Sequence, residues 1–160
     1  MIRLTEMTEQ ECHLLADWNR GRDAAYLCQW AGPAVYQAPL TEEQVLGRLR
    51  QPGVRLFLAR EDGEPVGSVE LDRSGQSPGS AHICRFLLPE AVQGRGLGGQ
   101  ILRALCRMAW EELGLDRLTL RVYCFNVGAI RCYEGCGFRV REFHPAEKTG
   151  WDSYTMELKR

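Results

Sequence analysis

Residues Val92–Leu105 read VQGRGLGGQILRAL, and this stretch decides which fold and which chemistry the chain can support. Four glycines surround one arginine, and an apolar helical pattern starts at once, with Leu97, Ile101, Leu105 and Met108 on one face. Glycines let backbone N–H groups converge on an anion, and a helix start adds unpaired N–H groups and the positive end of a dipole. A flexible loop or close helix–sheet packing would also need glycines. Alone, the stretch leaves an anion cradle and a hinge as alternatives.

Two common nucleotide-binding motifs do not account for this stretch. Gly94, Gly96 and Gly99 satisfy GxGxxG, but in a dinucleotide-binding fold that motif directly follows a strand and an acidic residue ends the next strand. Here Pro89 separates the preceding strand from the glycines, and the next predicted strand ends in VYCFN without an acid. No Gly-Lys-Ser/Thr follows, which excludes a Walker P-loop. A nicotinamide-dependent reductase is therefore a disfavoured alternative.

The composition limits the classes to which the chain can belong. A length of 160 residues, 44% of them hydrophobic and 26% charged, is sufficient for one domain with one buried core. The formal charge of −1 gives no overall field that attracts nucleic acid or anionic lipid. No apolar run approaches the roughly 18 residues that span a bilayer, and the N-terminus has no apolar signal core. We expect a cytoplasmic protein that binds neither nucleic acid nor membrane.

Cysteine is abundant, but its spacing does not indicate a metal or disulfide framework. The chain has seven cysteines and no CxxC pair. Cys132 and Cys136 have the closest spacing, and none of the three histidines lies near them. A structural zinc site would need four ligands at defined spacings. We therefore interpret the cysteines as reduced thiols, several of them in core positions, and expect no metal site.

Hydrophobic patterning predicts an α+β fold. Thr8 and Thr41 are each followed three residues later by Glu or Gln, the spacing of a capping box, and a further helical stretch ends at Gly32. Alternating apolar residues then predict strands around the hairpin turn DGEP and a further strand at 81–88. After the glycine-rich stretch the order is helix, strand at 117–123, helix, strand and strand. This order predicts a mostly antiparallel sheet with one parallel junction.

A second motif resolves the ambiguity of the glycine-rich stretch. Residues Val122–Phe138 read VYCFNVGAIRCYEGCGF. Together with PEAVQGRGLGGQIL this sequence resembles the GNAT superfamily of acetyl-CoA-dependent N-acetyltransferases. The first family motif, Gln/Arg-x-x-Gly-x-Gly/Ala, is met by Gln93, Gly96 and Gly98. The second, an Asn followed by Ala, Tyr and Gly-Phe, is met by Asn126, Ala129, Tyr133, Gly137 and Phe138.

The resemblance implies a fold and a domain organisation. GNAT members have a mixed, mostly antiparallel sheet of about six to seven strands with helices on both faces, and the central strands splay apart at the cofactor site. Because the element order matches along nearly the whole chain, we expect a single N-acetyltransferase domain at 1–160. Residues 1–53 would form a helical part that shapes the acceptor site. Residues 54–142 would form the cofactor-binding core, and residues 143–160 a loop and the C-terminal strand.

The resemblance also implies acetyl-CoA as the cofactor and CoA as a product. In the family, the backbone of the central strand pairs with the pantetheine arm, and the pyrophosphate sits on the glycine-rich turn. The cofactor-binding residues implied here are Phe86, Leu87, Leu88, Gln93, Gly94, Arg95, Gly96, Leu97, Gly98, Gly99 and Asn126. Arg95 would add a charged donor at the rim, and Asn126 is also placed to cap the following helix.

The implied reaction is direct attack of a primary amine on the acetyl thioester in a ternary complex. An alkylamine with a pKa near about 10.4 must lose a proton at neutral pH, and the departing thiolate benefits from a proton donor. Tyr133 matches the acid of the family. Where some members carry a glutamate, this chain has His82 or Arg121. His82, Glu70 and a water chain are therefore the candidate bases, with Glu70 otherwise a solvated strand carboxylate.

The acceptor site is less well defined by the sequence. Trp18, Tyr26 and Trp30 are the expected walls, although aromatic residues at helical spacing are more often core residues. Asp17, Asp23 and Glu70 are candidates to hold a cationic amine, and Trp151 and Tyr154 to close the other side.

Several acceptors and one non-enzymatic function remain as alternatives. A protein N-terminus, a lysine, an amino acid, an antibiotic amine or a polyamine would all supply the amine, and the near-neutral net charge disfavours the polyamine. A homodimer is compatible with the resemblance, but no sequence feature requires one. The alternative to catalysis is a sensor or partner module that binds CoA or acyl-CoA, because the expected catalytic carboxylates are missing.

Overall fold

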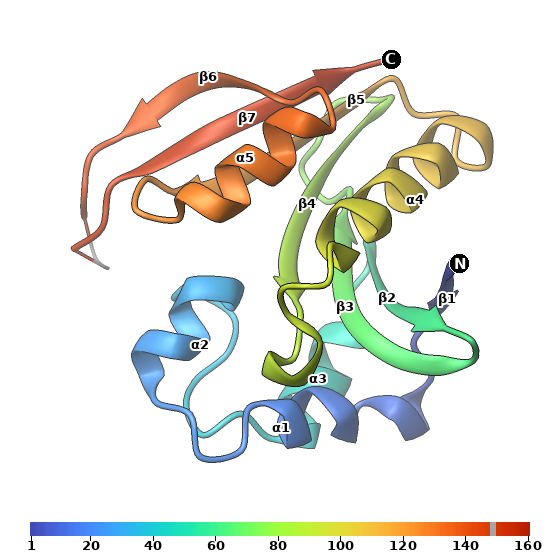
Figure 1. The fold of residues 1–160 in the computed structure, drawn as a ribbon, viewed down its shortest axis with the longest axis vertical. Helices are drawn as coiled ribbons and strands as arrows, with labels where there is room; N and C mark the ends of the chain where they lie inside the picture. The colour runs from blue at the N-terminus through green and yellow to red at the C-terminus, as the bar shows by residue number, and fades with distance from the viewer. Residues whose placement is uncertain (148–149) are drawn as a thin grey trace.

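Figure 1 shows the fold in a computed structural model, which describes residues 1–147 and 150–160. One sheet contains seven strands in the order β1-β2-β3-β4-β5-β7-β6. The strands are β1 Ile2–Glu6, β2 Val54–Glu61, β3 Glu64–Asp72, β4 Ser80–Leu87, β5 Arg117–Tyr123, β6 Arg139–His144 and β7 Ser153–Lys159. The helices are α1 His13–Trp18, α2 Ala24–Ala31, α3 Glu42–Leu49, α4 Leu97–Glu111 and α5 Val127–Gly135, with 3-10 turns η1 Glu9–Glu11 and η2 Glu90–Val92. The predicted α+β fold is confirmed.

The strand pairing also agrees with the prediction. Neighbouring strands are antiparallel except for β4 and β5, which are parallel and are joined through α4. Asp62 and Gly63 form the predicted hairpin turn between β2 and β3 with positive φ angles of 51° and 84°. A two-residue turn of this kind matches the twist of the strands that it joins.

Helices cover both faces of the sheet (Figure 1). The predicted apolar face of α4 packs on one side, where Leu97, Ile101 and Leu105 share a buried core with Phe57. The three N-terminal helices pack on the other side, where their buried residues meet alternate positions of β2, including Leu58. The two cores explain why β2 is buried along most of its length.

The two capping boxes form to different extents. The Thr8 backbone N–H donates to Glu11 Oε1 at 3.0 Å, but this box opens the 3-10 turn η1, and α1 begins only at His13. The Gln44 N–H donates to Thr41 Oγ1 at 3.3 Å, whereas the Gln44 side chain binds the carbonyl groups of Gln37 and Pro39. The second box is therefore only half closed, because its amide links α3 to the preceding loop.

Strands β4 and β5 separate partway along their length, as the family resemblance implies. They are paired from Ser80 opposite Arg117 to Ile83 opposite Leu120, and no further. On the other side of β4 the register shifts by one residue between Cys84 and Leu87, and Arg85 in this bulge has a φ of 49°. A bulge bends and twists the strand that contains it. The end of β4 therefore leaves β5, and the gap between them holds the candidate site.

Candidate active site

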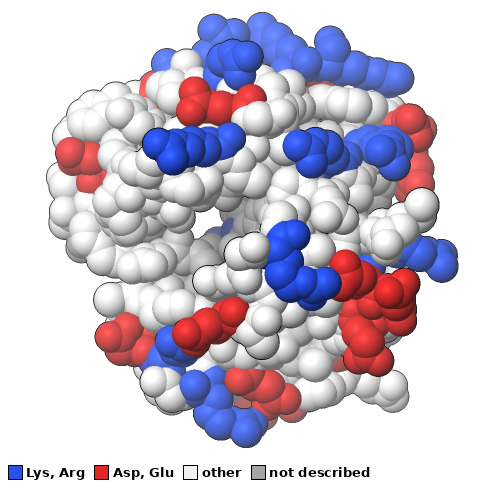
Figure 2. Space-filling view, viewed as in Figure 1, with Lys and Arg blue, Asp and Glu red and all other residues white. Residues whose placement is uncertain are grey.

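A cavity of about 1070 Å³ opens where β4 and β5 separate. Its walls come from the ends of these two strands, the glycine-rich turn, the first turns of α5, and α2 with the loop that follows it. Figure 2 shows a hollow in this face of the molecule, surrounded mainly by uncharged residues, between the positions of α2 and α5 in Figure 1. Segments from both halves of the chain therefore meet at one site.

The glycine-rich turn forms one end of the cavity. Gln93, Gly94, Gly96, Gly98 and Gly99 all line it. Gly94 and Gly96 have φ angles of 80° and 73°, and a Cβ atom added at either would meet no atom within 4 Å. Gly96 is the N-cap of α4 and supplies no side-chain cap. The first N–H groups of α4 thus lack intrahelical partners and lie beside an unfilled turn that lines the cavity, an arrangement that fits a diphosphate.

Two residues around this turn differ in role from the prediction, and a third was not predicted. Arg95 is absent from the cavity lining, and its Nη2 donates to Glu61 Oε1 at 2.6 Å instead of facing the turn. The Leu97 side chain is 2% exposed and belongs to the core under α4. A cation that the sequence analysis missed, Arg103, lies beside the turn but also outside the lining: a Cβ atom on Gly99 would stand 3.2 Å from Arg103 Nη1. The spacing of four residues on one helix was the signal that could have identified it.

The end of β4 forms the floor between the turn and the splayed strands. Phe86, Leu87 and Leu88 line the cavity, as predicted. The β5 side of β4 is unpaired beyond Ile83, so an extended ligand arm can pair with this backbone as an added strand would. Gln93 Nε2 donates to the Leu88 carbonyl at 2.8 Å and so fixes the strand end to the turn.

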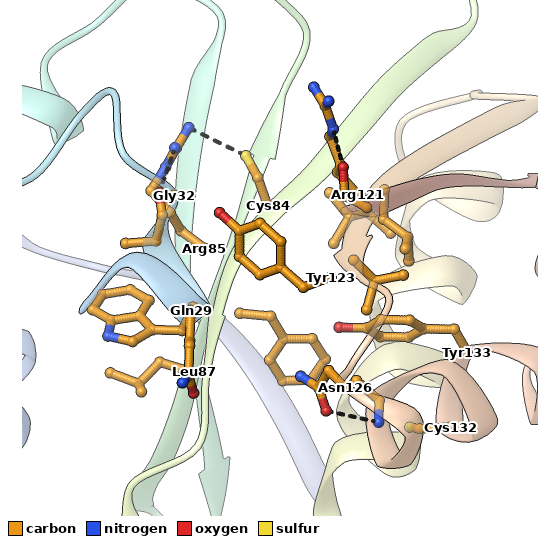
Figure 3. Close-up of a pocket in the computed structure, with 18 of the residues that line it drawn as sticks. Gln29, Gly32, Cys84, Arg85, Leu87, Arg121, Tyr123, Asn126, Cys132 and Tyr133 are labelled. Carbon is orange, nitrogen blue, oxygen red and sulfur yellow. Dashed lines mark hydrogen bonds between the residues drawn. The ribbon is translucent and has the colours of Figure 1, made fainter. Parts of the chain in front are cut away.

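Asn126 and Tyr133 enter the cavity from α5 (Figure 3). Asn126 Oδ1 accepts a hydrogen bond from the Ala129 N–H at 3.3 Å, so it caps the helix as expected. The hydroxyl of the half-buried Tyr133 points away from α5 toward the β4 side of the cavity (Figure 3). Burial raises the pKa of Tyr133 well above its ordinary value. The phenol therefore keeps its proton at neutral pH and can donate it.

His82 lines the cavity at the last paired positions of β4 and β5. Its Nδ1 lies 2.9 Å from Thr119 Oγ1, on the residue directly opposite in β5. Burial lowers the pKa of His82 and, together with the charges of Arg85 and Arg121, outweighs Asp72 and Glu70, which raise it. The imidazole is therefore neutral at pH 7, in the state in which it can accept a proton.

Glu70 is not a candidate base, and its interpretation as a solvated carboxylate was wrong. It is 1% exposed, does not line the cavity, and binds Arg48 and Arg85 through charge-assisted hydrogen bonds as short as 2.7 Å. Burial alone would raise the pKa of Glu70, but the hydrogen bonds from Arg85 and Arg48 outweigh it and lower the pKa to about 2. The carboxylate is a permanent anion that holds Arg85 in the β4 bulge.

The acceptor side of the cavity contains some of the predicted aromatic residues and not others. Tyr26 and Trp30 line it from α2, and Trp151 lines it from the loop before β7. Trp18 instead packs against the core of the N-terminal helices. Tyr154 lies outside the lining, with its ring 5.9 Å from that of Phe143. These two assignments were wrong because helical and strand spacing do not tell which side of an element is covered.

The two aspartates proposed to hold an amine also lie outside the cavity lining. Asp17 pairs with Arg20 at 2.6 Å, and Asp23 caps α2 by accepting from the Tyr26 N–H at 2.8 Å. The cavity also contains Arg121, which the family resemblance placed at a catalytic position, and residues that the sequence analysis did not place there, namely Gln29, Cys84, Arg85, Tyr123, Cys132, Glu147 and Ser153. Strand alternation around Val122 was the available signal for Tyr123.

Comparison with known proteins agrees with this geometry. Residues 9–138 match the model of the acetyltransferase (GNAT) family. The chain belongs to this family. The aminoglycoside N(6')-acetyltransferase type 1 of Klebsiella pneumoniae is 28% identical over 151 residues, which cover 86% of this chain and 73% of the relative. The L-amino acid N-acetyltransferase AaaT of Escherichia coli is 29% identical over 92 residues, 56% of each chain.

Solved GNAT structures share the whole fold. The crystal structure of aminoglycoside acetyltransferase AAC(6')-Ib in complex with coenzyme A has a TM-score of 0.80 and 25% identity, and covers 100% of this chain and 95% of that chain. The spermidine N-acetyltransferase from Vibrio cholerae, solved with CoA and spermine, has a TM-score of 0.81 and 18% identity, and covers 99% of this chain and 95% of that chain. At this identity the similarity supports the fold alone. This GNAT protein is therefore an acetyltransferase that uses acetyl-CoA to acetylate amines.

Within residues 1–147 and 150–160, no helix has the length and hydropathy of a membrane-spanning helix. The same residues contain no group of three or more His, Cys, Asp or Glu side chains placed to hold a metal ion.

Proposed function

We propose that this GNAT enzyme acetylates the primary amine of a small molecule by direct attack in a ternary complex, with His82 as the base and Tyr133 as the acid. The observation that carries the proposal is the single cavity in which the glycine-rich turn, the unpaired edge of β4, His82 and Tyr133 surround one gap. The acceptors named for relatives are aminoglycosides, L-amino acids and spermine or spermidine, which are small amines. Residues 1–53 contribute to the acceptor side through Tyr26 and Trp30.

Each group has a defined task in this proposal. The first N–H groups of α4 and the Arg103 guanidinium hold the diphosphate, and the β4 backbone aligns the pantetheine arm. Acetyl-CoA supplies the acetyl thioester. His82 takes a proton from the amine, with its Nδ1–H donating to Thr119 Oγ1 so that Nε2 presents its lone pair. Tyr133 donates a proton to the departing sulfur and so stabilises the negative charge that develops on it as the C–S bond breaks.

The function is tested by incubating the protein with acetyl-CoA and a panel of amines, including peptides with a free N-terminus as a second acceptor class. We expect thiol release that depends on the amine, together with an acetylated product identified by mass. Binding of acetyl-CoA without turnover on any amine would instead support the non-catalytic sensor.

All seven cysteines are free thiols, which agrees with the cytoplasm as the proposed compartment.

The role of His82 predicts a specific pH dependence. A base must be unprotonated, so kcat/KM should fall as the pH drops through the pKa of His82, which burial places below its ordinary value of about 6.5. Replacing His82 by Gln keeps a hydrogen-bonding group beside Thr119 but removes the titrating base. We expect kcat to fall roughly 10-fold or more at pH 7.5, and the acid limb below about pH 6.5 to disappear. An unchanged pH profile in His82→Gln would favour a water chain.

A further inference from the structure

The charged groups of the cavity are distributed unevenly. Among the described residues that line it, the charged side chains are Arg85, Arg121 and Glu147. Glu70 neutralises Arg85 through two hydrogen bonds of 2.7 Å, from Nε and Nη2. Glu147 is exposed and lies on the loop after β6, at the rim. Arg121 is therefore the one cation of the described lining that no carboxylate of the described residues neutralises.

Arg121 lies next to the centre of the proposed reaction. It is the first residue of β5 beyond the last pair with β4, Ile83 opposite Leu120. Because side chains alternate along a strand, Arg121 projects on the same face as Thr119 and Tyr123, and Thr119 binds His82. Figure 3 shows Arg121 on the β5 side of the cavity, with Cys84 and Arg85 on the β4 side.

The guanidinium of Arg121 is held in place but not saturated. Its Nε donates to Ser153 Oγ at 3.1 Å, and Ser153 also lines the cavity. In the described part of the chain, neither Nη nitrogen of Arg121 has an acidic partner. Guanidinium groups bind carboxylates through parallel hydrogen bonds, and a tethered guanidinium has lost part of its conformational freedom beforehand.

We propose that the acceptor carries a carboxylate close to its amine, and that Arg121 binds this carboxylate while the amine faces His82. This inference rests on the proposed function. A polycationic acceptor needs several carboxylates in its pocket and is repelled by an unpaired guanidinium. Of the acidic residues expected to hold a cation, Asp17, Asp23 and Glu70 all lie outside the lining. The one acid of the described lining, Glu147, lies at the exposed rim, so the site favours an amino acid over a polyamine.

The aromatic residues around Arg121 indicate which part of the acceptor faces them. Tyr26 and Trp30 line the cavity from α2, and Tyr123 and Trp151 line the opposite side, with their rings 5.0 Å apart in an edge-on contact. Such surfaces bind apolar and aromatic groups. The acceptor is therefore an amino carboxylate with an apolar side chain, for which phenylalanine is a suitable probe.

The test compares phenylalanine with phenylalaninamide and spermidine as acceptors. Phenylalaninamide differs from phenylalanine in lacking the carboxylate charge. Its amine is less basic, so more of it is unprotonated and reactive at neutral pH. A preference for phenylalanine must therefore come from the site. We expect wild-type kcat/KM to favour phenylalanine over both other amines by about 10-fold or more. Arg121→Gln should remove this preference by raising the KM for phenylalanine about 10-fold, with the KM for acetyl-CoA within twofold of wild type. Arg121→Lys should restore part of the preference.

Arg139→Gln is the matched control, because Arg139 lies on β6 outside the cavity lining and, among the described residues, donates only to backbone carbonyl groups. It should behave as wild type. A wild-type preference for spermidine or for the amide, or an Arg121→Gln effect on acetyl-CoA alone, would overturn the inference and leave the proposed function intact. If no amine is acetylated, the proposed function fails, and calorimetric binding of phenylalanine to the CoA-saturated protein decides the role of Arg121 by itself.

Discussion

Replacing Gly96 by Asp should weaken acetyl-CoA binding at least about 100-fold, equivalent to about 2.7 kcal/mol. Gly96 precedes the first turn of α4, and a side chain there would meet no atom within 4 Å, so the fold has room for it. The new carboxylate would occupy the space over the turn and repel the diphosphate. Two like charges about 4 Å apart near a protein surface repel by up to about 4 kcal/mol, which exceeds the expected loss.

Gly96→Asn separates this charge effect from the backbone effect. Gly96 has a φ of 73°, and Asn and Asp are the non-glycine residues that tolerate this region best. Both variants should therefore lose a similar amount of stability, about 1 kcal/mol, measured by thermal unfolding. Calorimetric titration with CoA should show much weaker binding for the Asp variant than for the Asn variant. Equal affinities in the two variants would reject the anion cradle.

Sequence reasoning succeeded where local chemistry determines structure. The backbone at Gly94 and Gly96 requires positive φ, and the helix that follows begins where its apolar face begins. Asn126 caps α5 through the short side-chain contact that its residue type predicts. The separation of β4 and β5 came from the family resemblance, because strand spacing gives no information on where two strands stop pairing.

The errors arose where distant segments cover a strand or helix. Glu70 alternates with apolar neighbours, which correctly assigns it to the opposite face of β3. Its surroundings depend on Arg48, which arrives from α3 on a separate helix, and on the bulge at Arg85. A local sequence pattern predicts neither the position of Arg48 nor the bulge at Arg85. Trp18 and Trp30 likewise have similar helical contexts and both pack against the core of the N-terminal helices, but only Trp30 also lines the cavity.

Replacing Tyr133 by Phe should lower kcat about 10²- to 10³-fold while the dissociation constant of acetyl-CoA stays within about threefold of wild type. The substitution removes one hydroxyl from a half-buried ring and keeps the contact with Phe138, whose ring centroid lies 6.4 Å away. Burial holds the pKa of Tyr133 above its ordinary value, so the hydroxyl is protonated throughout the working pH range. The loss is therefore the loss of a proton donor to the thiolate.

Tyr154→Phe removes a hydroxyl outside the cavity lining and serves as the control, with little expected change in turnover. Full activity in Tyr133→Phe would exclude Tyr133 as the acid.

The kinetic constants that change, kcat or KM, are as informative as the size of the effect. A proton donated only as the C–S bond breaks stabilises the transition state and not the bound substrates, so kcat and kcat/KM should fall by the same factor. A rise in the KM for acetyl-CoA at constant kcat would instead make Tyr133 a binding residue.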